Sequence, residues 1–280
     1  MRNADQIFHF AAQVAVTTSL TDARLDFETN ALGTFNVLEA VRALDRPVPL
    51  VFTSTNKVYG ALPDVEMVKE GTRYRPADSR ILANGIGEDR NLDFHSPYGC
   101  SKGTADQYVL DHARCFGIPA TVFRMSCIYG PHQFGTEDQG WVAHFIIRAL
   151  AGEPITIYGD GYQVRDILFV EDLVDAFLLA QENIDRISGE AFNIGGGVAN
   201  TISLIELMEM IERLQGRPME RSFEPARTGD QRYYVSNTAK FRAATGWAPK
   251  YDVARGVREL FAWLAETRQA PRREHVRVAS

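Results

Sequence analysis

The first half of the chain alternates short apolar segments with longer amphipathic ones. Residues 7–10 and 47–54 are apolar runs that end in small or polar residues, which is typical of strands buried on both faces of a parallel sheet. Between them, residues 22–44 carry apolar side chains at helical spacing and predict a long amphipathic helix. A strand, a helix and a strand without a hairpin signal indicate a right-handed parallel crossover.

The same alternation continues to about residue 130. Residues 98–116 predict a second helix that ends at Gly117, and residues 121–128 predict a third strand. The segment 60–97 is rich in proline, glycine and charge, so we expect a long loop that forms a lid or a wall of a site. Ligands of open α/β sheets bind at the carboxyl ends of the strands, so the polar residues after each strand are the candidates for chemistry.

Beyond residue 130 the alternation becomes irregular and predicts a smaller lobe. A strand is expected over 191–197, and helices over 139–151, 171–183, 203–215 and 253–267. The interpretation is an α/β fold in which a Rossmann-like parallel sheet lacks its first strands and is joined to a smaller α+β C-terminal substrate lobe. The partial dinucleotide-binding domain is predicted over residues 1–130, with residues 170–197 contributing to it. The substrate lobe is predicted over 131–169 and 198–270, and a disordered tail over 271–280.

Composition restricts the class of function. The 280 residues include 30 basic and 36 acidic side chains, a net charge of −6, which argues against nucleic acid as the main partner. No apolar run could span a bilayer and the N-terminus does not read as a signal peptide, so no membrane partner is predicted and the cytoplasm is the default location. The 3 cysteines and 6 histidines have neither disulfide nor metal-ligand spacing. We therefore expect no metal, and chemistry carried by side chains and an organic cofactor.

Tyr98 and Lys102 stand four residues apart at the start of the second predicted helix. This spacing places both side chains on one face, where the ammonium can approach the phenol. A neighbouring cation lowers the pKa of a tyrosine from its usual value of about 10, so we expect Tyr98 to act as a general base near neutral pH. An ordinary pair on a helix face is the alternative, and the surrounding sequence has to decide between them.

The surrounding sequence resembles the extended short-chain dehydrogenase/reductase family, which includes NAD-dependent nucleotide-sugar epimerases and dehydratases. Its strand ending S-[ST]-x-x-V-Y-G and its helix S-x-Y-x-x-S-K correspond here to Ser54-Thr-Asn-Lys-Val-Tyr-Gly60 and Ser96-Pro-Tyr-Gly-Cys-Ser-Lys102. The resemblance implies that Thr55 hydrogen-bonds the reacting sugar hydroxyl, that Tyr98 exchanges its proton, and that Lys102 holds the nicotinamide ribose of NAD. The alternative for Thr55 is that it merely caps the turn after the strand.

The resemblance also assigns residues to the cofactor. The segment His9-Phe-Ala-Ala-Gln13 resembles the family's H-x-A-A segment, whose small residues let the backbone approach the cofactor, and Asn30 is expected to support this loop. Ordinary helix packing is the competing explanation for the polar residues of the 22–44 helix. The full set implied at NAD is Ala11, Ala12, Gln13, Asn30, Thr53, Ser54, Tyr98, Lys102, Arg124 and Met125.

A second set of residues resembles the family's substrate pocket. Arg165, in Gln-Val-Arg-Asp, and Arg227, in Arg-Thr-Gly-Asp, resemble the arginines that clamp a substrate diphosphate. A guanidinium offers a planar fork of donors that suits phosphate oxygens, and a salt bridge to Asp166 or Asp230 is the structural alternative. The full set implied at the substrate is Asn56, Lys57, Cys127, His132, Gln133, Arg165, Arg227 and Asp230.

The resemblance extends to the reaction. Family dehydratases place an Asp-Glu acid–base pair directly after the catalytic Thr, where this chain has Asn56 and Lys57, so dehydration is disfavoured. The block from Met125 to His144 resembles epimerases that invert C2 of a CDP-linked deoxyhexose through a transient keto intermediate. We therefore expect an NAD-dependent epimerase of such a nucleotide sugar, working as a homo-oligomer. The alternatives are a non-catalytic remnant that still binds a CDP-sugar, and another nucleotide-sugar dehydrogenase or reductase.

The glycine-rich NAD fingerprint of the family is absent from this sequence. Gly195–Gly197 lacks its spacing, and the 7–10 strand corresponds to the family's fourth, so we expect a deficit of about 60–70 residues. The 7–10 strand would then be an apolar sheet edge that invites aggregation. The hypothesis is a truncated, mis-started or decayed form of an active enzyme, and the sequence leaves open both the exact sugar and the choice between NAD and NADP.

Overall fold

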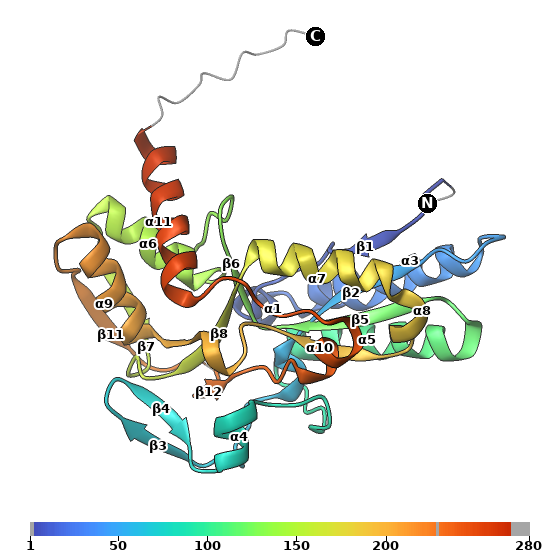
Figure 1. Ribbon diagram of the computed structural model, residues 1–280, viewed down its shortest axis with the longest axis horizontal. Coiled ribbons are helices and arrows are strands. Elements are labelled where there is room, and N and C mark those ends of the chain that lie inside the picture. Colours follow the sequence, from blue (N-terminus) through green and yellow to red (C-terminus); the bar gives the residue numbers. More distant parts are fainter. Residues whose placement is uncertain (1–2, 228–229, 270–280) are drawn as a thin grey trace, which may run out of the picture.

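Four parallel strands form the main sheet, in the order β1–β2–β5–β9. They span Ile7–His9, Leu50–Thr55, Ala120–Met125 and Ala191–Ile194. The computed structural model describes residues 3–227 and 230–269, and Figure 1 shows this sheet beside a second group of strands and helices. The strands are apolar on both faces, as the sequence pattern requires of a covered parallel sheet. The predicted α/β fold with a parallel sheet is confirmed.

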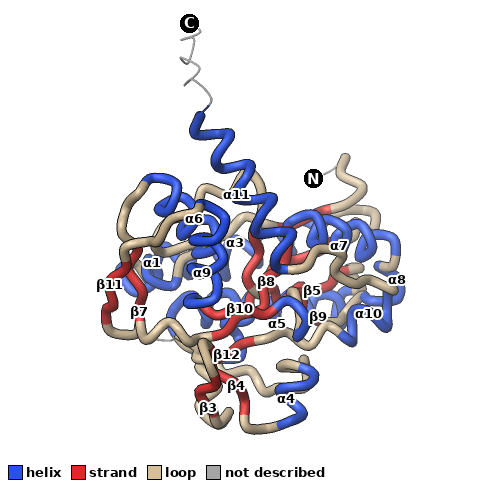
Figure 2. The backbone as a smooth tube through the Cα atoms, turned by 60° about the vertical axis from the view of Figure 1, so that its left-hand side comes forward, coloured by secondary structure: helices blue, strands red, loops and turns tan. Residues whose placement is uncertain are grey.

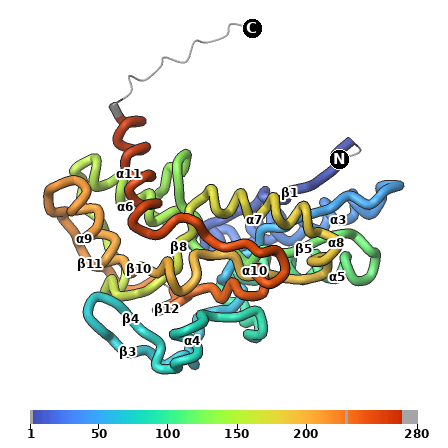
Figure 3. The backbone as a smooth tube through the Cα atoms, in the orientation of Figure 1, coloured from blue at the N-terminus to red at the C-terminus, as the bar shows by residue number. Residues whose placement is uncertain are grey.

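Helices cover both faces of the main sheet. Because successive strand residues point to opposite faces, Phe52 packs with the helices α3 (Gly33–Arg42) and α5 (Ser96–Phe116), whereas Val51 packs with α7 (Val170–Glu182). Figure 3 traces α7 and α5 on opposite sides of β5. Two short helices complete this region, α8 (Ile184–Ile187) and α10 (Ala239–Thr245).

The helix predicted over 22–44 consists of three consecutive parts. They are α2 (Ala23–Phe27), a π-helical turn η1 (Glu28–Leu32) and α3. A π-turn shifts the register of the side chains that follow it and occurs often at functional sites. A further helix, α1 (Val16–Thr21), precedes this segment and was not predicted.

The strand predicted over 121–128 is wrong as a single element. It breaks at Ser126 into β5 and β6 (Cys127–Tyr129), and β6 pairs with β8 (Val164–Phe169) in a second sheet that also contains β10 (Thr201–Ser203) and β12 (Tyr233–Tyr234). The Ser126 amide donates to the Ile194 carbonyl at 2.9 Å, and its hydroxyl donates to the Asp166 carboxylate at 2.5 Å. Ser126 thus bonds to both sheets, and the chain passes from one to the other at this residue.

The segment 60–97 is not the structureless lid or wall that its composition suggested. It contains a hairpin, β3 (Met67–Glu70) and β4 (Arg73–Pro76), followed by α4 (Ser79–Asn84). Figure 2 shows this hairpin and helix projecting from the main body of the molecule. Gly71 takes a φ of +58° in the turn, a conformation that glycine adopts without strain. The Arg73 guanidinium donates to the Glu206 carboxylate at 2.7 Å, and this bond fastens the hairpin to the C-terminal lobe.

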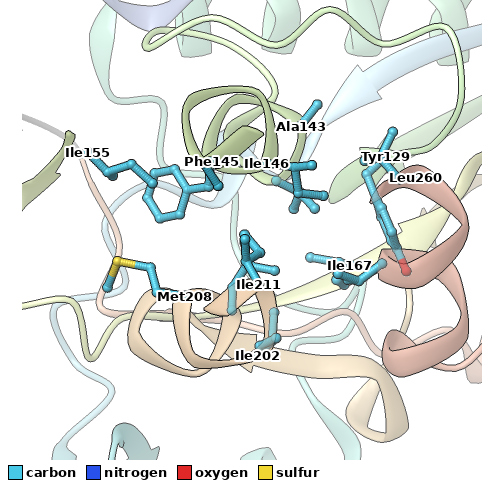
Figure 4. Close-up of a cluster of buried hydrophobic side chains, with 14 of the residues drawn as sticks. Tyr129, Ala143, Phe145, Ile146, Ile155, Ile167, Ile202, Met208, Ile211 and Leu260 are labelled. Carbon is cyan, nitrogen blue, oxygen red and sulfur yellow. The ribbon is translucent and has the colours of Figure 1, made fainter. Parts of the chain in front are cut away.

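The C-terminal lobe has its own hydrophobic core. Its elements are β7 (Ile155–Tyr158), β11 (Arg221–Glu224), α6 (Trp141–Ala151), α9 (Leu204–Gln215) and α11 (Val253–Gln269). Phe145, Ile211 and Leu260, from the three helices, belong to one buried cluster with Ile167 of β8, and Figure 4 labels all four. The helices predicted in this part of the chain are present, with ends shifted by up to two residues.

The tail predicted over 271–280 lies outside the residues that the structure describes. Across residues 3–227 and 230–269, none of the helices combines the length and apolar character that crossing a bilayer requires.

Candidate functional site

A cavity of about 570 Å³ opens where the carboxyl ends of β2 and β5 face the C-terminal lobe. Thr55 lies at the end of β2, Met125 ends β5, and Tyr98 is in the first turn of α5. This is the position at which open α/β sheets bind ligands. The sequence-predicted residues that line the cavity are Ser54, Thr55, Asn56, Lys57, Tyr98, Met125, Cys127, Gln133, Arg165, Arg227 and Asp230.

Tyr98 and Thr55 both line this cavity, and their side chains are close enough to interact. Burial raises the pKa of Tyr98 to about 12, because the phenolate loses hydration, and the interaction with Thr55 only partly opposes this. The two side chains therefore meet as predicted. The predicted direction of the Tyr98 pKa shift is wrong for the protein without ligands.

The position of the Lys102 ammonium explains why the predicted lowering of the Tyr98 pKa does not occur. This ammonium donates to the backbone carbonyl of Thr53 at 2.5 Å and lies 4.3 Å from the centre of the Phe52 ring. Burial lowers the pKa of Lys102 to about 8. Helical spacing placed Lys102 on the same face as Tyr98, but its ammonium hydrogen-bonds the Thr53 carbonyl of the adjacent strand. No local sequence pattern reveals this partner.

The N-terminal end of α5 is held by a helix that the sequence did not reveal. The Tyr98 amide donates to the hydroxyl of Ser19 in α1 at 3.2 Å. Thr17 and Leu20 of the same short helix line the cavity. With only 6 residues, α1 is too short for a periodic pattern to identify it.

A buried polar cluster fastens the loop after β1 to α5. Asn30 accepts from the Gln13 amide at 2.8 Å and donates to the Gln13 carbonyl at 3.0 Å and to the Ser101 hydroxyl at 3.1 Å. Asp26 accepts from the Gln13 side chain at 2.9 Å and from Ser101 at 2.5 Å. Asn30 thus holds the loop, as expected. Asp26 and Ser101 share the task and were missed, although both lie in the segments that carry the family resemblance.

Several residues predicted at the cofactor lie outside the cavity lining. The loop after β1 borders the cavity through Val14, and the adjoining helix α1 borders it through Val16. The hydroxyl of Thr53 donates to the His9 carbonyl at 3.1 Å. The predicted cofactor residues that do not line the cavity are Ala11, Ala12, Gln13, Asn30, Thr53, Lys102 and Arg124.

The side chain of Arg124, a residue predicted at the cofactor, points away from the cavity into the protein. Its guanidinium forms two bonds, of 2.9 and 3.0 Å, to the fully buried carboxylate of Asp106, and a third, of 3.1 Å, to the Tyr59 hydroxyl. Tyr59 in turn donates to Asn193 at 2.8 Å. A buried carboxylate on α5 requires a cation, and this requirement is met by Arg124 from the adjacent strand.

His132, a residue predicted at the substrate, does not line this cavity. His132 is exposed, and its ring lies 4.9 Å from the ring of Trp263 in α11. Its backbone has a φ of 68°, which is uncommon for a residue with a side chain. The neighbouring Gln133 lines the cavity and donates to the Ile128 carbonyl at 3.1 Å.

Two cations share one carboxylate on the cavity wall. Arg165 donates to Asp230 at 2.6 Å, and the Lys57 ammonium lies 3.9 Å from the same oxygen. Burial would raise the pKa of Asp230, but the positive charges of Arg165 and Lys57 outweigh it and hold that pKa below its usual range. Burial, reinforced by the charge of Arg165, lowers the pKa of Lys57. The predicted alternative of a salt bridge to Asp230 thus occurs for Arg165, inside the cavity.

Arg227 lies on another part of the cavity wall. Its guanidinium stacks 3.8 Å from the centre of the Tyr158 ring and pairs with Glu137 at 3.2 Å and Asp138 at 3.3 Å. Tyr158, Glu137 and Asp138 also line the cavity and were not predicted. The Tyr158-Gly-Asp-Gly turn was visible in the sequence and was the signal that could have indicated Tyr158.

Cys127 is covered by Trp141, which donates its indole N–H to the Cys127 sulfur at 3.3 Å. Burial raises the pKa of the Cys127 thiol, so it is a neutral wall group. Trp141 opens α6 and was missed as a cavity residue. Within the described part of the chain, no three His, Cys, Asp or Glu side chains are grouped so as to hold a metal ion.

Comparison with known proteins gives concordant matches. The profile of the NAD dependent epimerase/dehydratase family matches residues 1–195. The chain is 45% identical over 266 residues to the CDP-paratose 2-epimerase of Salmonella typhi, which covers 93% of this chain and 78% of that protein.

Solved structures are similar over the same extent. The UDP-glucose 4-epimerase of Thermotoga maritima with UDP-glucose matches with a TM-score of 0.80 and 30% identity, over 95% of this chain and 78% of that one. The UDP-glucuronic acid 4-epimerase of Bacillus cereus with UDP-glucuronic acid and NAD matches with a TM-score of 0.78 and 26% identity, over 94% and 76%.

Proposed function

Because this chain belongs to the NAD dependent epimerase/dehydratase family, we propose that it inverts C2 of a CDP-linked deoxyhexose, converting CDP-paratose and CDP-tyvelose into each other. The observation that carries the chemistry is the Tyr98 phenol beside the Thr55 side chain in the cavity at the strand ends. The 45% identity to a CDP-paratose 2-epimerase supports the choice of sugar and nucleotide.

The residues at the strand ends fit the nicotinamide-ribose half of NAD. Ser54 lines the cavity, and its buried hydroxyl has no hydrogen-bond partner among residues 3–227 and 230–269, so a ligand hydroxyl or amide would satisfy it. Tyr98, Ser54 and Met125, which line the cavity there, would hold this half of the cofactor. When bound there, NAD would supply the hydride acceptor and donor for C2, and the positive charge of its nicotinamide would favour the phenolate form of Tyr98.

Tyr98 and Thr55 then divide the proton transfer. Thr55 hydrogen-bonds the C2 hydroxyl and orients it toward Tyr98, which takes the hydroxyl proton as the carbonyl forms and gives it back when the alcohol is restored. Since the pKa of Tyr98 is about 12 without ligands, the phenolate becomes a substantial species near neutral pH only after a cation has bound beside it.

The residues after Thr55 favour epimerisation over dehydration. Expulsion of water from the sugar needs an acid–base carboxylate pair, and this chain has Asn56 and Lys57 at those positions. Asn56 lines the cavity, and its side-chain amide donates to the Gln231 side-chain oxygen at 3.4 Å. An amide and an ammonium cannot supply the proton shuttle of two carboxylates.

Product analysis tests the proposal. The purified chain is incubated with NAD and CDP-paratose carrying deuterium at C2, and the sugar is examined by NMR. We expect CDP-tyvelose that retains the deuterium at C2, with no net NADH. Accumulation of NADH would indicate a dehydrogenase instead. Calorimetric binding of CDP without NAD binding or turnover would indicate a non-catalytic CDP-sugar-binding remnant.

A further inference from the structure

We propose that Ser19 is a positioning residue, whose hydroxyl caps the helix that carries Tyr98 and thereby fixes the Tyr98 phenol beside Thr55. This inference rests on the proposed function, because it concerns how Tyr98 is held for the proton transfer. Ser19 precedes Tyr98 by 79 residues and belongs to α1, so the cap comes from a separate element of the fold.

The helix α5 begins without a cap from its own N-terminal residues. The side chain of an N-cap residue usually accepts a hydrogen bond from the N–H of the second or third helical residue. In α5 the second residue is Pro97, which has no N–H, and the third is Tyr98. His95 at the N-cap forms no such bond, and the Ser96 hydroxyl accepts from the Gly99 amide instead, at 3.2 Å. The Tyr98 amide therefore needs an acceptor from outside the helix.

Ser19 supplies this acceptor with a hydroxyl whose direction is fixed. The hydroxyl donates to the Val16 carbonyl at 2.7 Å and accepts from the Tyr98 amide at 3.2 Å. Because a hydroxyl has a single proton, the bond to Val16 leaves its lone pairs free to accept from Tyr98. Ser19 is fully buried, so solvent does not compete for this bond.

Ser19 is itself held in place by the loop that follows β1. The Ser19 amide donates to the Ala15 carbonyl at 3.2 Å, and the same carbonyl accepts from the Gln13 side chain at 2.8 Å. The backbone amide and carbonyl of Gln13 are both bonded to the side chain of Asn30. These hydrogen bonds connect Asn30, Gln13, Ala15 and Ser19 to the amide of Tyr98, so the fold of this loop helps to set where α5 begins.

The cap matters for the reaction because Tyr98 lies in the first turn of α5. Proton transfer requires hydrogen-bonding contact between the phenol and the sugar hydroxyl, and small displacements of a reacting group lower the rate steeply. Without the Ser19 hydroxyl, the Tyr98 amide would be buried and unpaired, which is unfavourable. The first turn would shift to find another acceptor, and the phenol would move away from Thr55 with it.

Turnover of CDP-paratose by Ser19→Ala and Ser19→Cys tests the assignment. In Ser19→Ala we expect kcat to fall about 10-fold and KM to stay within about twofold, because Tyr98 is displaced while the groups that bind the substrate remain. Ser19→Cys fills the same space with a sulfur that accepts hydrogen bonds only weakly, so its kcat should fall as well. Thr18→Ala, which removes an exposed hydroxyl from the same helix, should change neither parameter.

Hydrogen exchange followed by mass spectrometry separates a local effect from misfolding. The first turn of α5 should exchange faster in both Ser19 variants than in the unsubstituted protein, while the strands of the main sheet keep their protection. If Ser19→Ala lost protection across the main sheet, Ser19→Cys alone would decide.

The outcomes also separate this inference from the proposed function. A kcat of Ser19→Ala within about twofold of the unsubstituted protein would overturn the role of Ser19 and leave the proposed function standing. A full kcat in Ser19→Cys would do the same, because it would show that Ser19 only fills space. Absence of turnover by the unsubstituted protein would overturn the proposed function, and the role of Ser19 with it.

Discussion

Replacement of His9 should change how the stability of the protein depends on pH. His9 lies at the end of β1, is 7% exposed, and bonds Thr34 at 3.0 Å through its Nε2 atom. Burial, with a smaller contribution from the charge of Lys102, lowers the pKa of His9 from 6.5 to about 4. Between pH 6.5 and pH 4, His9 is protonated in the unfolded chain but neutral in the folded protein. The free energy of unfolding therefore falls as the pH drops from 6.5 to 4.

The size of the effect follows from the two pKa values. Between pH 8 and pH 5 the folded protein should lose about 2 kcal/mol through His9 alone, approaching about 3 kcal/mol below pH 4. His9→Gln keeps a hydrogen-bonding side chain for Thr34 and cannot titrate. The free energy of unfolding of this variant should therefore not include the loss at low pH that is due to His9. Other groups titrate as well, and the difference between parent and variant isolates His9.

Urea unfolding at several pH values, followed by tryptophan fluorescence, measures the difference. The stability of His9→Gln relative to the parent should rise by about 2 kcal/mol from pH 8 to pH 5. His95→Gln serves as the control, because the His95 side chain is 44% exposed. Parallel pH profiles for the parent and His9→Gln would show that His9 takes up its proton in the folded protein and would refute the reasoning.

Three further substitutions test the site and its support. Tyr98→Phe should lower the rate of epimerisation at least 100-fold, while calorimetry should find the CDP affinity nearly unchanged. A smaller loss of rate would show that Tyr98 does not carry out the proton transfer. Asp106→Asn leaves the Arg124 guanidinium buried without its carboxylate and should cost about 3–5 kcal/mol in urea unfolding, partly recovered in Asp106→Asn/Arg124→Met. Asn30→Ala should weaken NAD binding several-fold and spare CDP binding, and equal losses would point to general misfolding.

Local patterns determined the helix that carries Tyr98 and Lys102 and the parallel strands of the main sheet. Continuous apolar runs require burial on both faces, and helical spacing requires one buried stripe, so each element could be identified from its own residues. The resemblance of the strand ending at Thr55 and of the Tyr98 helix to a known family then predicted these two residues as the reacting pair. Those residues do meet in the structure.

Only the tertiary structure decided which partner each polar group takes. Arg124 and Lys57 are both cations near strand ends, yet Arg124 turns inward to Asp106 and Lys57 lines the cavity with Asp230. Lys102 bonds a strand carbonyl rather than the phenol one turn away. Periodicity reports which face of an element is buried, whereas the choice of partner and the direction of a pKa shift depend on groups that are distant in the chain and are brought together only by packing.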